Sequence, residues 1–137
     1  MAELKLEIVT PQRRVLDENV DGVMVPTQNG EIGVLPEHAP LISQLKSGIL
    51  TYTQGATTNK MVVSGGFVEV GQNRVSVLAD VAEFANEIDT SAARLERDEV
   101  ERNLGAWSGN AEDFEAERDR LERAEARLQL AAAGSVR

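Results

Sequence analysis

The sequence has 137 residues, 42% of them hydrophobic, with no cysteine and a formal net charge of -9. This acidic balance disfavours binding to nucleic acid or to an anionic bilayer, because both need a basic protein face, and the absence of cysteine excludes disulfides and thiolate metal sites. No apolar segment approaches the ~18–20 residues of a membrane span, and the start of the chain lacks signal-peptide features, so we expect a soluble protein in the cytoplasm or at its edge.

Residues 1–87 are expected to form short β-strands, since they hold most of the valine and isoleucine and all four prolines. Residues 4–8 alternate between apolar and charged side chains, which indicates a half-buried strand. Further strands are expected at 15–16, 20–25, 32–35, 41–45, 49–53, 60–63, 67–70 and 74–78. Pro26 is expected to stop one of them, and hairpin turns are expected at Asn29–Gly30 and at 71–73. Strands at this spacing favour an antiparallel sandwich or barrel.

A corner with two prolines interrupts these strands. Pro36 and Pro40 each fix φ and lack a backbone donor, so a central strand cannot continue through them. The result is expected to be a rigid, exposed corner that presents Glu31, Glu37 and His38, and such corners more often serve contact than packing. For the single histidine, three interpretations stay open: a general base, a surface turn residue or a residue at a subunit contact.

Residues 88–137 contain no proline and no lysine, and there eight arginines and twelve acidic residues alternate with alanine and leucine. This composition predicts two antiparallel helices, with Asp89 as the N-cap of the first, Gly105 at its C-terminus and Asn110 as the N-cap of the second. The expected apolar seam is thin and consists of Ala93, Val100, Leu104, Phe114, Leu121, Ala124, Leu128 and Ala131. We therefore expect a weakly packed hairpin that can dock, open or repack on a partner.

The second helix carries a basic face. Arg120, Arg123 and Arg127 are three and four residues apart and so share one side of the helix. Two interpretations stay open: these side chains meet an acidic partner or anionic ligand, or they pair with neighbouring carboxylates. Elsewhere no pattern for catalysis, metal binding or phosphate binding is present, and Ser64–Gly66 favours a strand bend over a phosphate contact. We assign no catalytic residue and no metal ligand.

Three segments carry a resemblance to a known family: GEIGVLPEHAPL at 30–41, SGGFVEV at 64–70, and VSVLAD at 75–80 with Glu83 after it. With these segments in this order, the chain resembles the epsilon-subunit family of bacterial F-type (proton-translocating) ATP synthases over essentially its whole length. The resemblance implies an all-β N-terminal domain, an antiparallel ten-stranded β-sandwich over residues 1–87. It further implies a C-terminal α-helical hairpin over residues 88–137.

The resemblance also implies a function and partners. It implies a non-catalytic subunit of the central stalk that couples proton translocation to ATP synthesis and inhibits ATP hydrolysis through its hairpin. The implied partners are the gamma subunit, the ring of c subunits and the alpha/beta catalytic head, at the cytoplasmic face of the bacterial inner membrane. Two alternatives stay open: an ATP-binding nucleotide-sensor module and a free-standing protein-interaction scaffold.

Site residues follow from the same resemblance. Glu31 matches a position that faces the polar loops of the c-ring, and His38 lies in the same c-ring and gamma contact region. Glu37 stands where many family members have glycine, and it adds a negative charge there. Basic side chains of the second helix are implied to face acidic loops of the beta subunits, and the candidates are Arg118, Arg120, Arg123 and Arg127.

Some family members bind ATP through an Ile-Asp-x-x-Arg-Ala motif in the folded hairpin. Here that segment begins with Ile88 and Asp89, but Ala92 replaces the motif arginine. The candidate ATP-binding residues are Glu83, Ile88, Asp89, Arg123 and Arg127. Losing one charge-assisted phosphate contact typically lowers affinity by about ten- to hundredfold. We therefore expect no cofactor, and the missing arginine argues against ATP as a regulatory ligand.

Overall fold

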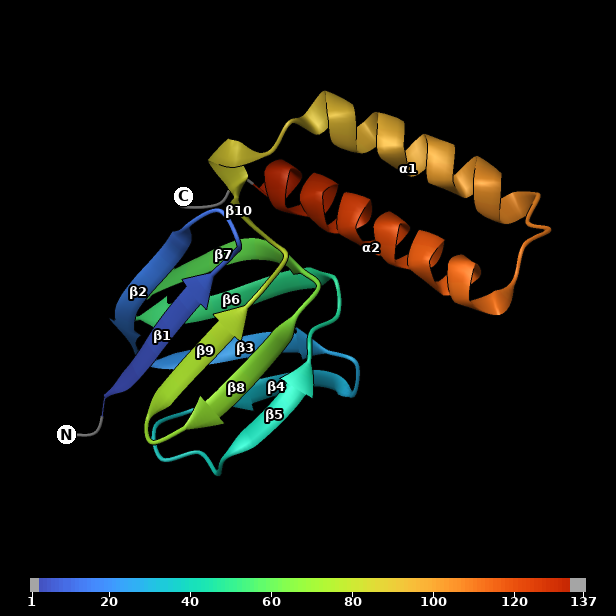
Figure 1. The fold of residues 1–137 in the computed structure, drawn as a ribbon. Helices are drawn as coiled ribbons and strands as arrows, with labels where there is room; N and C mark the ends of the chain where they lie inside the picture. Colours follow the sequence, from blue (N-terminus) through green and yellow to red (C-terminus); the bar gives the residue numbers. More distant parts are fainter. Residues whose placement is uncertain (1–2, 134–137) are drawn as a thin grey trace.

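The computed structural model describes residues 3–133, and residues 134–137 of the predicted helical region lie outside this range. Two packed β-sheets are followed by two α-helices (Figure 1). The strands are β1 (Leu4–Val9), β2 (Arg14–Val20), β3 (Gly22–Thr27), β4 (Gly30–Val34), β5 (Leu41–Gln44), β6 (Gly48–Gln54), β7 (Thr57–Ser64), β8 (Phe67–Gly71), β9 (Arg74–Leu78) and β10 (Val81–Phe84). The helices are η1 (Ala85–Glu87, a 3-10 helix), α1 (Thr90–Gly105) and α2 (Ala111–Ala133). The predicted β-sandwich followed by a helical hairpin is confirmed.

Each sheet has five strands. Sheet A has the order β2-β1-β9-β8-β5, and sheet B has the order β10-β7-β6-β3-β4. The pairings between neighbouring strands are antiparallel except that of β1 with β9, which is parallel and places Leu6 opposite Val75. This pair refines the expected antiparallel sandwich. The alternation within β1 predicts which face is buried, but no local pattern indicates that its neighbour comes from the far end of the sandwich sequence.

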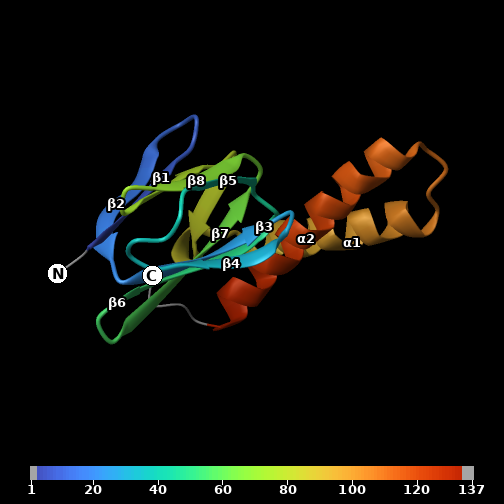
Figure 2. The same ribbon diagram turned by 90° about the horizontal axis from the view of Figure 1, so that it is seen from below.

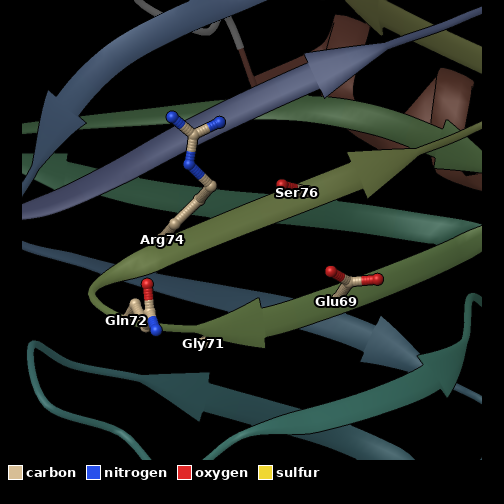
Figure 3. Close-up of a pocket in the computed structure, with 5 residues that line it drawn as sticks. All are labelled: Glu69, Gly71, Gln72, Arg74 and Ser76. Atoms are coloured by element: carbon tan, nitrogen blue, oxygen red, sulfur yellow. The ribbon is translucent and has the colours of Figure 1, made fainter.

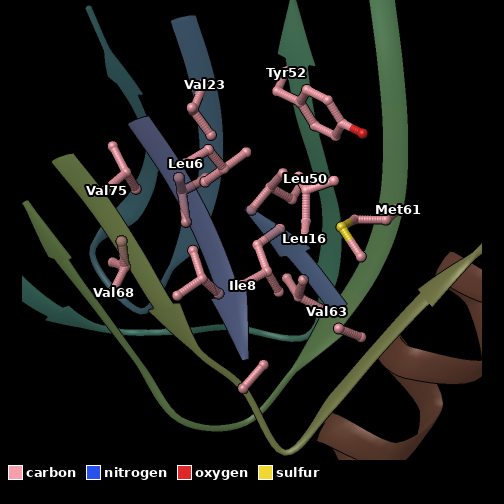
Figure 4. Packing of buried hydrophobic residues seen from close by; sticks show 14 of the residues in the cluster. Leu6, Ile8, Leu16, Val23, Leu50, Tyr52, Met61, Val63, Val68 and Val75 are labelled. Atoms are coloured by element: carbon pink, nitrogen blue, oxygen red, sulfur yellow. The ribbon is translucent and has the colours of Figure 1, made fainter. Parts of the chain in front are cut away.

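Aliphatic side chains from the inner faces of both sheets fill the space between them (Figure 4). On β1 the side chains of Leu4, Leu6 and Ile8 are buried, and those between them are half-exposed, as the alternation predicts. Sheet B contributes Leu50 and Tyr52, which are fully buried. Each such side chain stabilises the fold by roughly 1.5–3 kcal/mol on burial, so the sandwich holds most of the apolar stabilisation of this chain.

Pro26 lies inside β3 and does not stop it, contrary to the expectation from the sequence. It pairs with Glu31 of β4, and its carbonyl accepts a hydrogen bond from the backbone N–H of Lys46. The backbone N and C=O of one strand residue point to the same side of the strand. The nitrogen of Pro26, which has no hydrogen to donate, therefore faces the β5–β6 segment and not β4. The ladder between β3 and β4 therefore loses no hydrogen bond at the proline.

The segment Ser64–Gly66 forms a bend between β7 and β8, as expected. Gly66 has a φ of 90°, and a Cβ placed on it would lie 1.8 Å from the carbonyl oxygen of Leu78. Only glycine permits so close an approach of two backbone segments. The bend is therefore occupied by the chain itself and leaves no room for a phosphate at this point.

Both predicted helix starts are confirmed. The Asp89 carboxylate accepts a hydrogen bond from the Ala92 N–H at 3.0 Å, and the Asn110 side chain accepts one from the Asp113 N–H at 2.8 Å. Each cap satisfies an amide that the first turn of a helix would otherwise leave unpaired. The two helices lie side by side, and their connecting turn is at the end of the hairpin farthest from the sandwich (Figures 1 and 2).

Helix α2 has two apolar faces, of which the sequence pattern indicated one. Ala124 is fully buried on the expected seam. Ala126 and Leu130 are buried on a second face, where they pack with Val62 of sheet B. Two residues around a helix differ in direction by roughly 200°, so these side chains and the seam face different neighbours. Helix α2 thus lies between α1 and the sandwich, and it is the helix that contacts β6 and β7.

Candidate functional site

Three arginines of α2 converge on one carboxylate of α1. The Glu96 carboxylate lies 3.2 Å from Arg120 Nη2, 3.5 Å from Arg123 Nη2 and 3.5 Å from Arg127 Nη1. We call these four residues the Glu96 cluster. The side chains of Glu96 and Arg127 are only 21% and 20% exposed, so solvent screens the cluster less than an ordinary surface pair. Of the two open interpretations, pairing with carboxylates holds in this structure, but the main carboxylate is on the other helix.

Arg127 also joins the hairpin to the sandwich. Its Nε donates a hydrogen bond of 2.7 Å to Glu83 Oε1 at the end of β10. The same guanidinium therefore contacts carboxylates from the sandwich and from α1. A planar guanidinium with several donors suits such a bridging position. Arg127 of α2 thus links α1 to β10 of sheet B.

Arg118 lies apart from the Glu96 cluster. Its side chain is 57% exposed, and its nearest carboxylate is Glu115 at 3.8 Å, one turn earlier on α2. Exposed pairs of this kind contribute at most about 1 kcal/mol. Of the four arginines implied to contact beta subunits, three belong to the Glu96 cluster, and Arg118 pairs only with an exposed carboxylate of its own helix.

A second carboxylate lies beside Arg120. Glu117 accepts hydrogen bonds from Arg120 Nη1 at 2.7 Å and from Asn103 Nδ2 at 3.2 Å. The Arg120 hydrogen bond first, and the Asn103 hydrogen bond second, lower the pKa of Glu117 below its ordinary value of 4.5. The hydrogen bond to Glu117 raises the pKa of Arg120, and partial burial opposes that rise. The Asn103 hydrogen bond ties the last turn of α1 to α2.

A depression of about 270 Å³ lies next to the Glu96 cluster, where β10, η1 and both helices meet. Its lining residues are Glu83, Glu87, Asp89, Ala92, Ala93, Glu96 and Arg127. Three of the candidate ATP-binding residues are thus brought together, namely Glu83, Asp89 and Arg127. The lining holds four carboxylates and one guanidinium, and Arg13 pairs with Glu87 from outside it at 2.6 Å. This excess of negative charge opposes entry of a polyphosphate. The alanine that replaces the motif arginine is part of the wall.

The other two candidate ATP-binding residues lie elsewhere. Ile88 packs against the small apolar cluster of Val62, Ala126 and Leu130 beneath α2. Arg123 is directed to Glu96 and does not line the depression. The structure therefore places three of the five candidates at one depression and uses Ile88 for packing.

Glu31 and His38 lie toward opposite ends of β4, so Glu31 is not part of the proline corner, contrary to the expectation from the sequence. Glu31 sits at its start and lines a groove with Glu122 and Glu125 of α2. His38 follows the other end, where its Nδ1 lies 2.7 Å from the carbonyl oxygen of Ala39. A strand advances about 3.3 Å per residue, so the two side chains belong to different ends of the sandwich. Their assignment to one contact region stays a prediction, and it requires a partner surface that reaches both ends.

An exposed apolar patch on the outer face of sheet A was missed in the sequence. Ile42, Phe67 and Leu78 are 69%, 55% and 52% exposed. Phe67 of β8 pairs directly with Leu78 of β9. Ile42 of β5 is diagonal to Phe67, two residues from its direct partner on that strand. The signal was available, because Val68 and Val70 occupy the inward positions of β8 and so leave Phe67 outward. We call these three residues the sheet A patch.

Polar side chains lie on the same face as the sheet A patch. A hollow of about 290 Å³ is lined by Glu69, Gly71, Gln72, Arg74 and Ser76 (Figure 3). Arg74 Nη1 lies 3.3 Å from Glu7 of β1, so its charge is partly paired. An apolar centre with polar neighbours is the usual composition of a protein-binding surface.

Two further observations bear on the class of protein. Among residues 3–133 no helix is long and apolar enough to cross a bilayer. In the same part of the chain no three acidic or histidine side chains gather as metal ligands. The features that stand out are instead an open apolar patch on one sheet and a charged hairpin on the other. The fold and these surfaces define a sandwich-plus-hairpin protein built for contact with other proteins.

The comparisons with known proteins identify the family. Residues 3–85 match the family described as ATP synthase, Delta/Epsilon chain, beta-sandwich domain. The ATP synthase epsilon chain of Syntrophobacter fumaroxidans is 46% identical over 132 residues, which cover 96% of this chain and 98% of the relative. That of Symbiobacterium thermophilum is 42% identical over 134 residues, covering 97% and 96%. The chain belongs to the ATP synthase delta/epsilon family.

Solved structures agree with this assignment. A chain of the Euglena gracilis mitochondrial ATP synthase, in a structure of its OSCP, F1 and c-ring, matches with a TM-score of 0.78 and 27% identity. The match covers 96% of this chain and 82% of that one. A chain from the central stalk and c-ring of the Tetrahymena thermophila mitochondrial enzyme matches with a TM-score of 0.61 at 14% identity and shows the shared fold.

Proposed function

We propose that this chain is a non-catalytic subunit of the central stalk of a bacterial F-type ATP synthase. The observation that carries the proposal is the extent of the match, since relatives named ATP synthase epsilon chain align over both the sandwich and the hairpin. In this role the chain couples proton translocation to ATP synthesis through contacts with the gamma subunit and the c-ring. It works at the cytoplasmic face of the inner membrane as part of the complex.

The sheet A patch is the surface we propose for the gamma subunit. Ile42, Phe67 and Leu78 form the open apolar face of the sandwich, while the outer face of sheet B carries α2. A few side chains in the water-excluded centre of an interface supply most of the free energy of protein association. Glu31 and His38 then contribute polar contacts at the two ends of the same domain, with Glu31 directed to the c-ring.

The hairpin is proposed to restrain ATP hydrolysis through the basic face of α2. In the folded hairpin Arg120, Arg123 and Arg127 already have carboxylates as partners. An exchange of these internal carboxylates for acidic loops of beta subunits would replace one set of ion pairs with another. Both arrangements are accessible when the two sets of ion pairs differ little in free energy.

Deletion of the hairpin tests this part of the proposal. We expect an enzyme assembled with residues 1–87 alone to hydrolyse ATP faster than the complete enzyme, because the restraining helices are gone. The sandwich retains the sheet A patch, so co-purification with gamma should persist. Unchanged hydrolysis in a normally assembled enzyme would reject the inhibitory role, and loss of gamma from the truncated chain would reject the sandwich as the attachment domain.

A further inference from the structure

The turn between β3 and β4 carries a chemically reactive dipeptide. Of the seven asparagines in the chain, Asn29 is the one followed by glycine. Asparagine is thermally labile because the backbone nitrogen of the next residue can attack its side-chain amide. Glycine offers that nitrogen with no Cβ beside it. A Cβ added to Gly30 would meet no atom within 4 Å, so the fold leaves the approach to this nitrogen open.

The side chain of Asn29 is exposed and has no hydrogen-bond partner within residues 3–133. Its carboxamide is therefore free to rotate toward the nitrogen of Gly30. The turn lies at the end of sheet B that is nearer to α2 (Figure 2). This end faces solvent, so water has access to the dipeptide.

The other six asparagines lack this combination. The side chains of four of them are hydrogen-bonded, which holds the amide away from the main chain; these are Asn59, Asn73, Asn103 and Asn110. Asn19 and Asn86 have no such bond, but Val20 and Glu87 follow them, and their side chains crowd the attacking nitrogen. The chain thus contains its own controls for reactivity.

The main chain on both sides of Asn29 is held in place. The N–H of Gln28 donates to the carbonyl oxygen of Gln44 at 2.9 Å. The Thr27 hydroxyl accepts a hydrogen bond from the Asn29 N–H at 3.2 Å and donates one to the Gly30 carbonyl oxygen at 2.5 Å. One hydroxyl therefore spans the dipeptide, and any change in its backbone length is felt at both contacts.

We propose that Asn29 is a site of spontaneous deamidation, which converts part of the chain to an isoaspartyl linkage between residues 29 and 30. The Gly30 nitrogen gives its proton to hydroxide and attacks Cγ of Asn29. The bond from Cγ to the side-chain nitrogen breaks, and this nitrogen leaves as ammonia. One water molecule then opens the five-membered succinimide. Attack of water on Cγ gives aspartate, and attack on the main-chain carbonyl carbon gives isoaspartate, so the net change is amide plus water to carboxylate plus ammonium.

Both products alter the start of β4. Each adds a negative charge beside Glu31, which already shares a groove with Glu122 and Glu125. The isoaspartyl form also adds one carbon to the main chain between the two groups that the Thr27 hydroxyl holds. It breaks one of these hydrogen bonds and displaces Glu31 from its pairing with Pro26. The modification thus changes the surface proposed for the c-ring, and only this consequence rests on the proposed function.

Incubation of the isolated full chain tests the chemistry independently of any partner. The folded chain and a synthetic peptide of residues 26–33 are kept at the same temperature at about pH 8. Digested samples are then compared by chromatography and mass spectrometry with peptides that carry aspartate or isoaspartate at residue 29. We expect Asn29 to convert within about 100-fold of the peptide rate, since a misplacement of about 1 Å in a reacting geometry costs that much. The other six asparagines should remain amides.

A rate more than about 100-fold below that of the peptide would overturn the proposal, because the fold would then hold the two groups apart. Earlier conversion of another asparagine would overturn it as well. Asn29→Gln is the matched control: it keeps the amide, but its longer side chain closes a six-membered ring far less readily. Release of ammonia by this variant should fall to background, and unchanged release would place the reaction elsewhere.

The displacement of Glu31 has a separate readout. Freshly purified Asn29→Asp carries the added charge with a normal main chain, whereas the isoaspartyl fraction carries the same charge and the extra carbon. The isoaspartyl fraction should therefore unfold at a lower Tm than Asn29→Asp. Equal Tm values would show that the turn absorbs the extra carbon, and would overturn the predicted displacement of Glu31.

Discussion

The backbone N–H of Glu37 donates a hydrogen bond to the side-chain oxygen of Asn73 and thereby ties the proline corner to the β8–β9 turn. Glu37 makes this contact with a φ of 68°, in the left-handed region. A side chain in that region costs about 1–2 kcal/mol, and glycine avoids the cost. This backbone conformation is a physical reason for the glycine that the resemblance implies at this position.

We therefore expect Glu37→Gly to stabilise the sandwich by about 1 kcal/mol, which corresponds to a rise in Tm of about 4–8 °C for a domain of this size. The hydrogen bond to Asn73 survives the change because the backbone donates it. Glu37→Ala serves as the control, since it removes the same charge and keeps the strained conformation. Equal shifts in Tm for the two variants would attribute the effect to charge and contradict the explanation from backbone strain.

Acidification should weaken the contacts between α1 and α2. Hydrogen bonds from Arg120 and Asn103 hold the pKa of Glu117 below 4.5, so the ionised carboxylate stabilises the folded hairpin. This contribution is fully present above pH 4.5 and is lost as the pH falls through the lower, folded-state pKa. Trp107 emission and the helical circular dichroism of the full chain, followed from pH 7 to pH 3, should report the loss. In Glu117→Gln the contacts between α1 and α2 should be weaker at pH 7, and the change in both signals on acidification should be smaller. An unchanged response of the signals to acid would rule out Glu117 as its source.

Titration with MgATP tests the acidic depression. We expect no measurable heat at millimolar MgATP, because the lining holds four carboxylates against the single guanidinium of Arg127 and Ala92 contributes no charge. Ala92→Arg should bind MgATP at least about tenfold more tightly than the natural chain, since a charge-assisted hydrogen bond contributes roughly 1.5–3 kcal/mol. Thr90→Arg, two residues away on the same helix, is the matched control. Micromolar binding by the natural chain would show that the depression accepts ATP despite its charge.

A charge in the sheet A patch should weaken attachment to gamma. Phe67 is 55% exposed, so Phe67→Asp is not expected to disturb the core of the sandwich. If gamma covers this side chain, the buried charge should lower the affinity by on the order of 30-fold or more, the range of a hot-spot residue. Thr58→Asp, at an exposed position of β7, controls for added charge. Equal affinities of the two variants would place gamma on another surface.

Local patterns predicted most of the fold. The alternation in β1, the turn at 71–73 and the caps Asp89 and Asn110 are all set by residues close together in sequence. The pairing of β1 with β9 was not predictable in this way, because it joins segments far apart in the chain. Pro26 was misjudged because its effect depends on which side of the strand its missing donor faces.

The candidate site was predictable to a smaller extent. Helical spacing correctly placed Arg120, Arg123 and Arg127 on one face. It could not identify Glu96 as their common partner, because that depends on how α1 lies across α2. The second apolar face of α2, Ala126 and Leu130, was missed because two apolar residues, one of them small, are too sparse a pattern. The resemblance to the family supplied the remaining assignments.

The parallel pair of β1 and β9 has a consequence for synthesis. Sheet A places β1 between β2 and β9, so one edge of residues 4–9 lacks its partner until residue 78 has left the ribosome. An unpaired strand edge is open to wrong pairings, and folding dominated by distant contacts is slow. The first strand made is thus among the last to be completed. The helices emerge after the sheets are able to close, and α2 docks on a surface that already exists.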